Sequence, residues 1–238
     1  MSGSLVAAAT GLVEPPHFAS VPDLAELAEV SAAFEHQPAS AVVAWAWERY
    51  GTSAILAASF QDCVLIDVAV QVVPDIEVVF LDTQYHFAET LWFRDQVRER
   101  YDLDLTVIEP RVAPDDLWAT NPDECCRLRK VEPLDRALAG RNAWMTGLRR
   151  DEAASRTTTP IVSYDVSRDL VKVNPLAAWT GTDVAGYVRD HDLPVHPLAE
   201  HGYSSIGCWP CTRPITEGED PRAGRWSGVN KTECGLHE

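Results

Sequence analysis

Four of the six cysteines in the chain form two close pairs that could bind a metal centre. Cys125 and Cys126 are adjacent, and Cys208 and Cys211 form a Cys-x-x-Cys pair. Thiolates at such spacings bind zinc, hold an iron–sulfur cluster or form a redox dithiol. Neighbouring helical residues point about 100° apart, so Cys125 and Cys126 reach a common centre best when that centre is broad. Spacing therefore favours an iron–sulfur cluster, with a zinc staple and four unrelated cysteines as alternatives.

The other two cysteines stand in different surroundings. Cys234 belongs to residues 233–237, close to the end of the sequence, and a thiol on a terminal tail can move into a site. The alternative is an ordinary exposed cysteine, which solubility disfavours. Cys63 is followed by three aliphatic residues and is expected to be a small buried hydrophobe. Cys234 is therefore the candidate reactive thiol.

The charge of the 238-residue chain is strongly negative and unevenly distributed. It has 36 acidic and 20 basic residues, and a formal net charge of −16. That balance argues against a general binder of nucleic acid or of an anionic membrane. Residues 127–156, directly after the first cysteine pair, nevertheless carry a net charge of +4. This basic block predicts a pocket for a small anion; the alternative is a solvated helix face with i,i+4 pairing, which suits Arg136 and Arg141.

Targeting signals are not evident in the sequence. The sequence contains no run of 18 apolar residues, so it predicts no membrane span. A secretory signal needs a positively charged start, but the first basic residue of the sequence is Arg49. We therefore expect a cytoplasmic protein, whose thiols bind metal or catalyse rather than form disulfides. The sequence is compatible with a homo-oligomer.

Alternating apolar and amphipathic segments predict an α/β fold, with a twisted parallel sheet covered by helices on both faces. Strands are expected at residues 54–58, 76–81, 103–108 and 143–146, and a hairpin at 161–173. Helices are expected at residues 22–35, 38–49, 62–73, 86–100, 122–138 and 182–191.

The domain organisation predicted from this pattern has three parts. Residues 1–20 form a flexible lead-in and residues 21–193 an α/β nucleotide-binding domain. Residues 194–238 are rich in Gly, Pro and Trp, and are expected to be an irregular segment of the same domain, ending in a mobile tail. Such a segment needs an anchor, which the cysteine pairs could supply.

Polar turns follow three of the predicted strands. These turns contain Ser59, the pair Asp82 and Thr83, and Gly147. In a parallel sheet the carboxyl ends of the strands lie at one edge, where helix N-termini attract phosphate. Together the turns predict a nucleotide cleft at that edge.

Several stretches, together with the cysteine pairs and the terminal Glu-Cys-Gly-Leu-His, match one enzyme family. They are residues 59–62, 81–83, 89–90, 125–130, 146–150, 207–214, 222–226 and 233–237. The chain resembles the assimilatory adenylyl-sulfate reductases, within the larger group of adenylyl-sulfate and 3′-phosphoadenylyl-sulfate reductases. The resemblance covers the chain from about residue 50 to its end.

The resemblance implies a Rossmann-like fold related to the adenine-nucleotide α-hydrolases, with Ser59 in a modified pyrophosphate loop. The ATP-splitting relatives have a Ser-Gly-Gly-x-Asp-Ser loop, whereas this sequence has Phe60 and Gln61 where the paired glycines would stand. This departure counts against ATP cleavage and suits a phosphosulfate. The resemblance also implies that Cys125, Cys126, Cys208 and Cys211 bind one 4Fe–4S cluster, which ties down the irregular tail. Family members that prefer the 3′-phosphorylated substrate generally lack this quartet, so its presence points to adenylyl sulfate.

The chemistry implied by the resemblance places Cys234 at its centre. The Cys234 thiolate attacks the sulfur of adenylyl sulfate, AMP leaves, and thioredoxin releases sulfite from the S-sulfocysteine. Lys130, Arg222 and Arg225 match positions that hold the phosphosulfate.

Further positions implied for the nucleotide cleft are those near the adenosine and in the polar turns. They are Gly147, Arg156, Ser59, Asp82 and Thr83.

Three other functions are compatible with parts of the pattern. The first is a reductase for 3′-phosphoadenylyl sulfate, or for both substrates. The second is a cluster-containing tRNA-thiolating enzyme, which predicts a Gly-rich loop and a basic RNA-binding surface that this sequence lacks. The third is a zinc-stapled nucleotide-binding module without catalysis.

Overall fold

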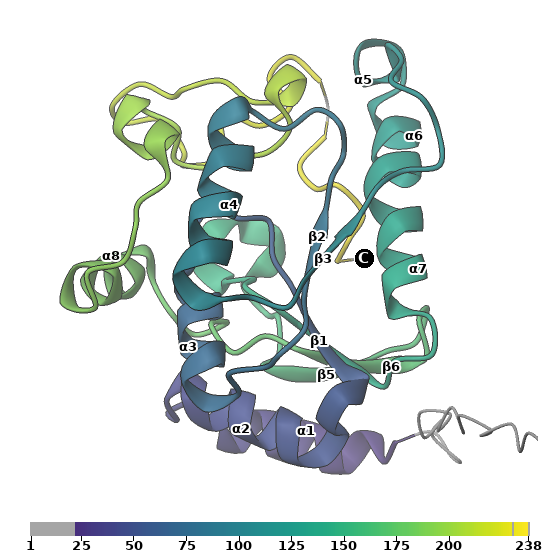
Figure 1. Cartoon of the computed structure of the whole chain (residues 1–238), viewed down its shortest axis with the longest axis vertical. Coiled ribbons are helices and arrows are strands. Elements are labelled where there is room, and N and C mark those ends of the chain that lie inside the picture. The colour runs from purple at the N-terminus through teal and green to yellow at the C-terminus, as the bar shows by residue number, and fades with distance from the viewer. Residues whose placement is uncertain (1–21, 230, 238) are drawn as a thin grey trace, which may run out of the picture.

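The computed structural model describes residues 22–229 and 231–237 (Figure 1). The predicted flexible lead-in at residues 1–20 lies outside these described residues. Within them, none of the helices combines the length and the apolar character needed to cross a bilayer.

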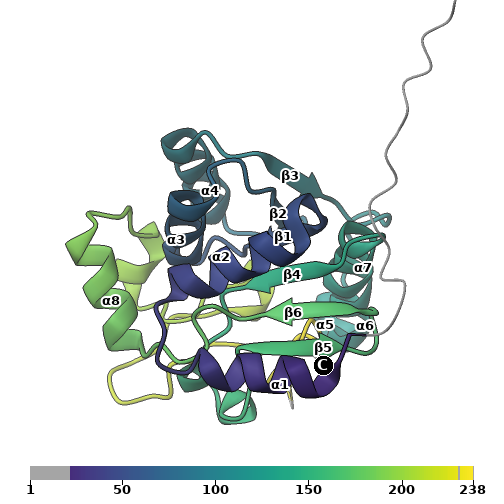
Figure 2. The same ribbon diagram turned by 90° about the horizontal axis from the view of Figure 1, so that it is seen from below.

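A six-stranded sheet in the order β3-β2-β1-β4-β6-β5 forms the centre of the molecule (Figure 2). All neighbouring strands are parallel except β5, which pairs antiparallel with β6 at the edge. The strands are β1 (Ala54–Ala57), β2 (Val78–Leu81), β3 (Leu105–Ile108), β4 (Ala143–Thr146), β5 (Val162–Asp165) and β6 (Leu170–Val173). The predicted α/β architecture and the hairpin are confirmed, and the hairpin extends the sheet because β6 also pairs with β4.

Helices cover both faces of the sheet, since the strands have apolar residues on both sides. On one face Leu56 and Met145 pack in a core with α1 to α4 and α8. On the other face Ile55 and Trp144 pack against Leu134 of α7. The helices are α1 (Leu24–Ala33), α2 (Ala39–Tyr50), α3 (Val64–Val72), α4 (Ala88–Tyr101), α5 (Leu117–Thr120), α6 (Pro122–Cys126), α7 (Glu132–Leu138) and α8 (Gly181–Asp190).

The single helix predicted at residues 122–138 is interrupted. It consists of α6, a π-helical turn at Arg127–Val131, and α7. Pro133 accounts for the interruption, because it lacks the N–H that a regular α-helix would bond to the carbonyl of Arg129. Such π turns are frequent at functional sites, and this one carries Lys130.

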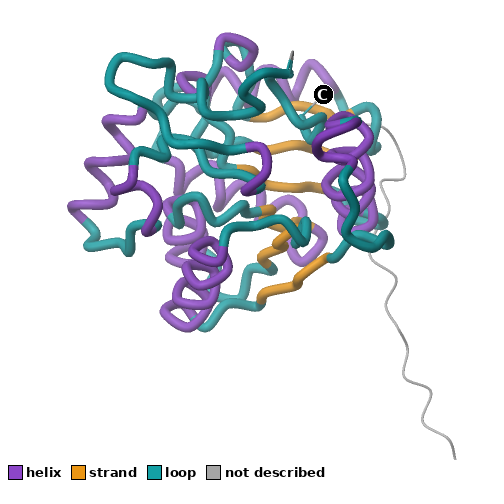
Figure 3. Tube along the Cα trace, turned by 90° about the horizontal axis from the view of Figure 1, so that it is seen from above, coloured by secondary structure: helices purple, strands orange, loops and turns teal. Residues whose placement is uncertain are grey.

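The helices described in the segment after α8 are two short 3₁₀ helices, Pro197–His201 and Trp209–Cys211, which agrees with its Gly and Pro content. It is held by the turns that follow the strands: the N–H of Ile206 donates to Gln61 Oε1 at 2.8 Å, and the N–H of Trp209 donates to the carbonyl of Tyr85 at 2.8 Å. Seen from above, loops cross in front of the strands at this end of the molecule (Figure 3). The irregular segment therefore closes the carboxyl end of the sheet.

Candidate active site

A cavity of about 210 Å³ lies at the carboxyl ends of the parallel strands. Ser59 after β1, Thr83 after β2 and Gly147 after β4 all line it. Strands β1 and β4 are neighbours although β2 and β3 lie between them in sequence, so the cavity lies at the topological switch point, where ligands bind in such sheets. The three polar turns thus meet at one cavity, as predicted.

The residues predicted from the C-terminal half also reach this cavity. Lys130, Arg156, Arg222, Arg225 and Cys234 are among its lining residues. Asp82 is the exception among the predicted binding residues. Its Oδ1 accepts a hydrogen bond from the N–H of Gln84 at 2.8 Å, so it shapes the turn after β2 instead.

The loop after β1 is shaped by Phe60, which is fully buried and adopts φ 55°, a left-handed conformation that side chains rarely take. Its ring packs edge-on against Phe80 at 5.4 Å between centroids, and this packing holds the strained residue in place. Asp62 then accepts from the N–H of Val64 at 3.1 Å, at the start of α3. The loop therefore has a buried aromatic anchor rather than a glycine-rich turn.

The lining of the cavity carries more positive than negative charge. Among the described residues, five cations face three carboxylates, which leaves a surplus of two positive charges. The cations are Lys130, Arg149, Arg156, Arg222 and Arg225, and the carboxylates are Asp62, Glu152 and Glu233.

The carboxylates do not neutralise the cations evenly. Arg149 lies 3.0 Å from Glu152 and 3.6 Å from Asp62, and Arg156 is bound by Glu152 and Glu233. In contrast, Lys130 and Arg225 have no carboxylate within ion-pair distance among the described residues. The surplus charge is therefore concentrated at these two side chains.

Arg225 is held by its surroundings without being neutralised. Its Nη1 donates to Ser205 Oγ at 3.2 Å, its guanidinium lies 4.6 Å from the ring centre of Trp226, and its Nε is buried without a hydrogen-bond partner in the described structure. A buried, unsatisfied donor on a cation is costly. An anionic ligand in the cavity would satisfy it.

Lys130 lies between three thiols. Burial acts to lower its pKa, but the charges of the Cys208, Cys234 and Cys126 thiols, when these are ionised, outweigh that effect, and the pKa of Lys130 is raised. Lys130 is therefore a cation that ionisation of the neighbouring thiols stabilises, and one of these thiols is the candidate nucleophile.

The C-terminal tail enters the cavity. Cys234, Leu236 and His237 all line it, and the His237 ring stacks on Trp144 with 5.7 Å between centroids. Burial, together with nearby cations such as Lys172 and Arg156, lowers the pKa of His237 well below its usual value. The His237 imidazole is therefore neutral at neutral pH.

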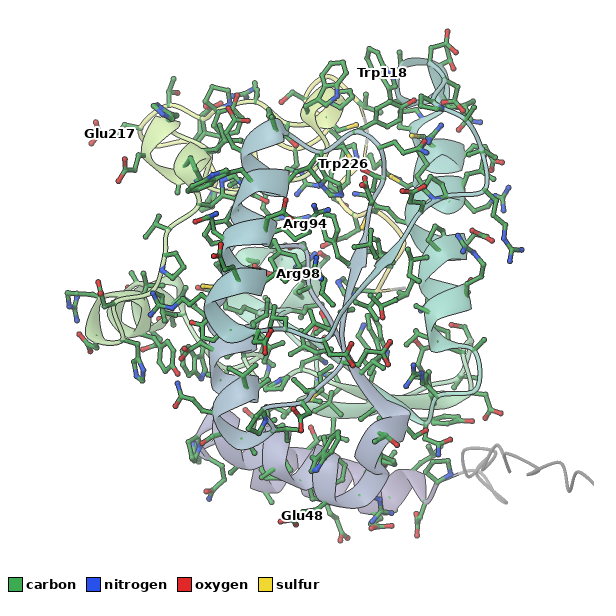
Figure 4. The ribbon with its side chains drawn as sticks, viewed as in Figure 1. Glu48, Arg94, Arg98, Trp118, Glu217 and Trp226 are labelled. Atoms are coloured by element: carbon green, nitrogen blue, oxygen red, sulfur yellow. The ribbon has the colours of Figure 1, made fainter. Side chains whose placement is uncertain are left out.

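A second, smaller cavity adjoins the first and brings the cysteine quartet together. Cys125, Cys126, Cys208 and Cys211 all line it, within walls that include Tyr85, Trp118 and Trp226. Trp118 lies at the outer end of the molecule on α5, and Trp226 lies deeper (Figure 4). Lys130, Cys208 and Trp226 line both cavities, so they form the wall between them.

The four thiols are donors of one chemical kind, and the other lining residues are three aromatic side chains, one proline and the cations Arg129 and Lys130. Burial raises the pKa of Cys125 to about 11, assisted by the neighbouring thiols of Cys126 and Cys208. Cys208 Sγ lies 3.3 Å from Thr83 Oγ1, which connects the quartet to the turn after β2. No three His, Cys, Asp or Glu side chains in the described part of the chain are placed to hold a single metal ion.

Several residues that line the main cavity were not among the site residues predicted from the sequence. Arg149 and Glu152 form an ion pair there, Glu233 binds Arg156, and His86 lies beside the end of β2. Two of them lie in stretches that the sequence marked as functional: Arg149 in the basic block and Glu233 in the terminal stretch. Their partners are set by the tertiary fold.

Comparison with known proteins agrees with this geometry. Residues 53–214 match the phosphoadenosine phosphosulfate reductase domain. A protein of Mycobacteroides abscessus called adenosine 5′-phosphosulfate reductase is 48% identical over 224 residues, covering 90% of this chain and 94% of that protein. The chain belongs to the phosphoadenosine phosphosulfate reductase family.

Other members of the phosphoadenosine phosphosulfate reductase family are similar in sequence or in structure. Adenosine 5′-phosphosulfate reductase of Mycobacterium tuberculosis is 51% identical over 191 residues, covering 77% of this chain and 75% of that protein. The crystal structure of phosphoadenylyl-sulfate reductase from Candida auris superposes with a TM-score of 0.70 at 25% identity, covering 79% of this chain and 96% of that one. FMN adenylyltransferase of Candida glabrata shares the fold alone. It superposes with a TM-score of 0.57 at 14% identity, covering 84% of this chain and 79% of that one.

Gly207 gives a test of the Arg225 position. A Cβ at residue 207 would overlap the Arg225 guanidinium, which is the end of a flexible side chain and would be displaced. We predict that Gly207→Ala lowers the affinity for AMP by about tenfold, because a charge-assisted contact is lost. Isothermal titration calorimetry measures the effect. Gly186→Ala, in α8 and outside the cavity lining, is the control, and equal affinity of both variants and the wild type would contradict the assignment.

Proposed function

We propose that this protein reduces adenylyl sulfate, which is adenosine 5′-phosphosulfate, to sulfite and AMP in assimilatory sulfate reduction. The observation that carries the proposal is the position of Cys234 in a cavity whose free cations are Lys130 and Arg225. A phosphosulfate carries two negative charges, which equals the surplus of positive charge in the lining. The relatives called adenosine 5′-phosphosulfate reductase support the same substrate.

The first step of the proposed reaction is nucleophilic attack. The thiolate of Cys234 forms a bond to the sulfur of the sulfo group, and the bond from that sulfur to the phosphate oxygen breaks. AMP leaves with the electron pair, and an S-sulfocysteine remains on the enzyme. Lys130, Arg222 and Arg225 would stabilise the negative charge that grows on the phosphate in the transition state.

The second step needs a dithiol reductant, for which we propose thioredoxin. One of its thiolates attacks the Cys234 sulfur, and sulfite leaves with the electrons of the broken sulfur–sulfur bond. The second thiol then resolves the mixed disulfide, so that the dithiol supplies both electrons and Cys234 regains its thiol.

We propose that Cys125, Cys126, Cys208 and Cys211 hold a 4Fe–4S cluster. Four thiols and no carboxylate line the small cavity, and all-cysteine ligation is typical of such clusters. The bound group would fix the C-terminal segment to α6 and contribute to the electrostatic field at Lys130, whereas the electrons come from the dithiol.

The second candidate substrate is 3′-phosphoadenylyl sulfate. The structural similarity to phosphoadenylyl-sulfate reductase of Candida auris favours it, whereas the cysteine quartet favours adenylyl sulfate. The two substrates differ in one phosphate group, so direct competition between them decides the question.

An anaerobic assay with thioredoxin tests the function. We predict that sulfite is released from adenylyl sulfate with a kcat/KM at least about tenfold above that for 3′-phosphoadenylyl sulfate, and that Cys234→Ser abolishes release because the nucleophile is lost. Cys63→Ala is the matched control, since Cys63 is buried outside the cavity lining and should leave turnover near that of the wild type. Full sulfite release by Cys234→Ser would contradict the mechanism.

Metal analysis tests the quartet. Protein purified without oxygen should contain about four iron and four sulfide ions per chain, with a broad visible absorption band. Cys126→Ser should lose most of both, whereas Cys63→Ala and Cys234→Ser should retain them. A colourless wild-type protein with one zinc ion per chain would contradict the cluster and favour a zinc staple.

A further inference from the structure

Glu233, next to the candidate nucleophile, makes more polar contacts than any other described residue of the tail. Its carboxylate accepts from Arg156 Nε at 2.8 Å and Nη2 at 2.7 Å, in the two-pronged geometry that gives strong, oriented ion pairs. Ser155 Oγ donates to it at 3.2 Å, and Arg222 Nη2 at 3.3 Å. Four donors from two separate segments therefore converge on one carboxylate.

The pair between Glu233 and Arg156 is shielded from water. The side chains of Arg156 and Glu233 are 11% and 14% exposed, so this contact is stronger than an ordinary surface ion pair. The Arg156 hydrogen bonds and the charges of Arg156 and Arg222 outweigh burial and lower the pKa of Glu233. Glu233 is therefore ionised and bound at neutral pH.

Arg156 directs its donors at carboxylates. Its Nε and Nη2 point at Glu233, and its Nη1 donates to Glu152 Oε2 at 2.5 Å. Glu152 in turn binds Arg149, so a row of alternating charges runs from the loop after β4 to the tail. In this arrangement Arg156 binds the tail, whereas Lys130 and Arg225 line the cavity with no carboxylate partner in the described part of the chain.

The contacts of Glu233 and His237 lie on either side of Cys234 in the tail. Beyond Cys234, His237 stacks on Trp144 and Leu236 packs against the core around α7. The stacking and apolar contacts fix the end of the tail, and the Glu233 contacts fix the residue before the thiol. The thiol is therefore held in the cavity from both sides.

We propose that Glu233 and Arg156 form a latch that positions Cys234 in the cavity for attack on the nucleotide. The proposal rests on the proposed function, because Cys234 must first face a nucleotide in the cavity and then a protein-sized dithiol.

The test is the rate at which iodoacetamide, a small neutral reagent, alkylates Cys234 in the anaerobically purified full-length protein. Peptide mass spectrometry follows the tail peptide, and the rate is taken at the high-pH plateau, where the thiol is fully ionised. The variants are Glu233→Gln, which removes the charge, and Arg156→Lys, which keeps the charge but loses the two-pronged geometry. The control is Glu219→Gln, because the Glu219 carboxylate also accepts from two nitrogens of one arginine, Nη1 and Nη2 of Arg213, and lies outside the cavity lining.

We expect alkylation about tenfold faster than in the wild type for Glu233→Gln and Arg156→Lys, and no change for Glu219→Gln. The double variant should be no faster than the faster single variant, since both remove one interaction. With adenylyl sulfate, Glu233→Gln should form the S-sulfocysteine more slowly in a single turnover, while its reduction by thioredoxin is not slowed.

Plateau rates equal to that of the wild type in both single variants would overturn the latch, even if the wild type turns over adenylyl sulfate. If the wild type forms no S-sulfocysteine while the alkylation difference persists, the positioning role of Glu233 stands and the proposed function falls. Additive effects in the double variant would also overturn the latch, because they would show that the two residues act separately.

Discussion

The site depends on a small surplus of positive charge enclosed within a strongly acidic protein. The whole chain carries −16, yet the cavity lining carries two more cations than carboxylates. Two cations, Lys130 and Arg225, have no carboxylate partner among the residues described. Buried charge of this kind is costly unless a ligand compensates it. The acidic surface repels polyanions, whereas the enclosed cations suit one small dianion, and this contrast limits the ligand to a small molecule.

The fold delivers these charges from distant parts of the sequence. The parallel sheet brings the turns after β1, β2 and β4 to one edge, the π turn carries Lys130, and the irregular segment after α8 adds Arg225. Cys208 connects the cysteine quartet to the main cavity, because it lines both cavities and its Sγ lies 3.3 Å from Thr83 Oγ1. Loss of the proposed cluster would therefore also disturb Arg225 and the tail.

The strands of this fold follow from local sequence, whereas the break in the predicted helix and the ion pair of the tail do not. The strands at residues 54–57 and 143–146 are short apolar runs between turn residues, so their existence and their common edge could be predicted. The break in the predicted helix at residues 122–138 arises from Pro133, whose effect on the position of Lys130 shows only in three dimensions. The pairing of Arg156 with Glu233 joins residues 77 apart in the chain, which no periodic pattern encodes.

We propose that Cys234 takes the sulfo group from a dianionic nucleotide held in this cavity. The most direct measurement is mass spectrometry of the protein after a single anaerobic turnover with adenylyl sulfate and no reductant. The predicted result is one added SO₃ group on the peptide that contains Cys234, with an equal amount of AMP released. Release of AMP and sulfite with no modified Cys234, or a sulfo group on any other residue, would contradict it.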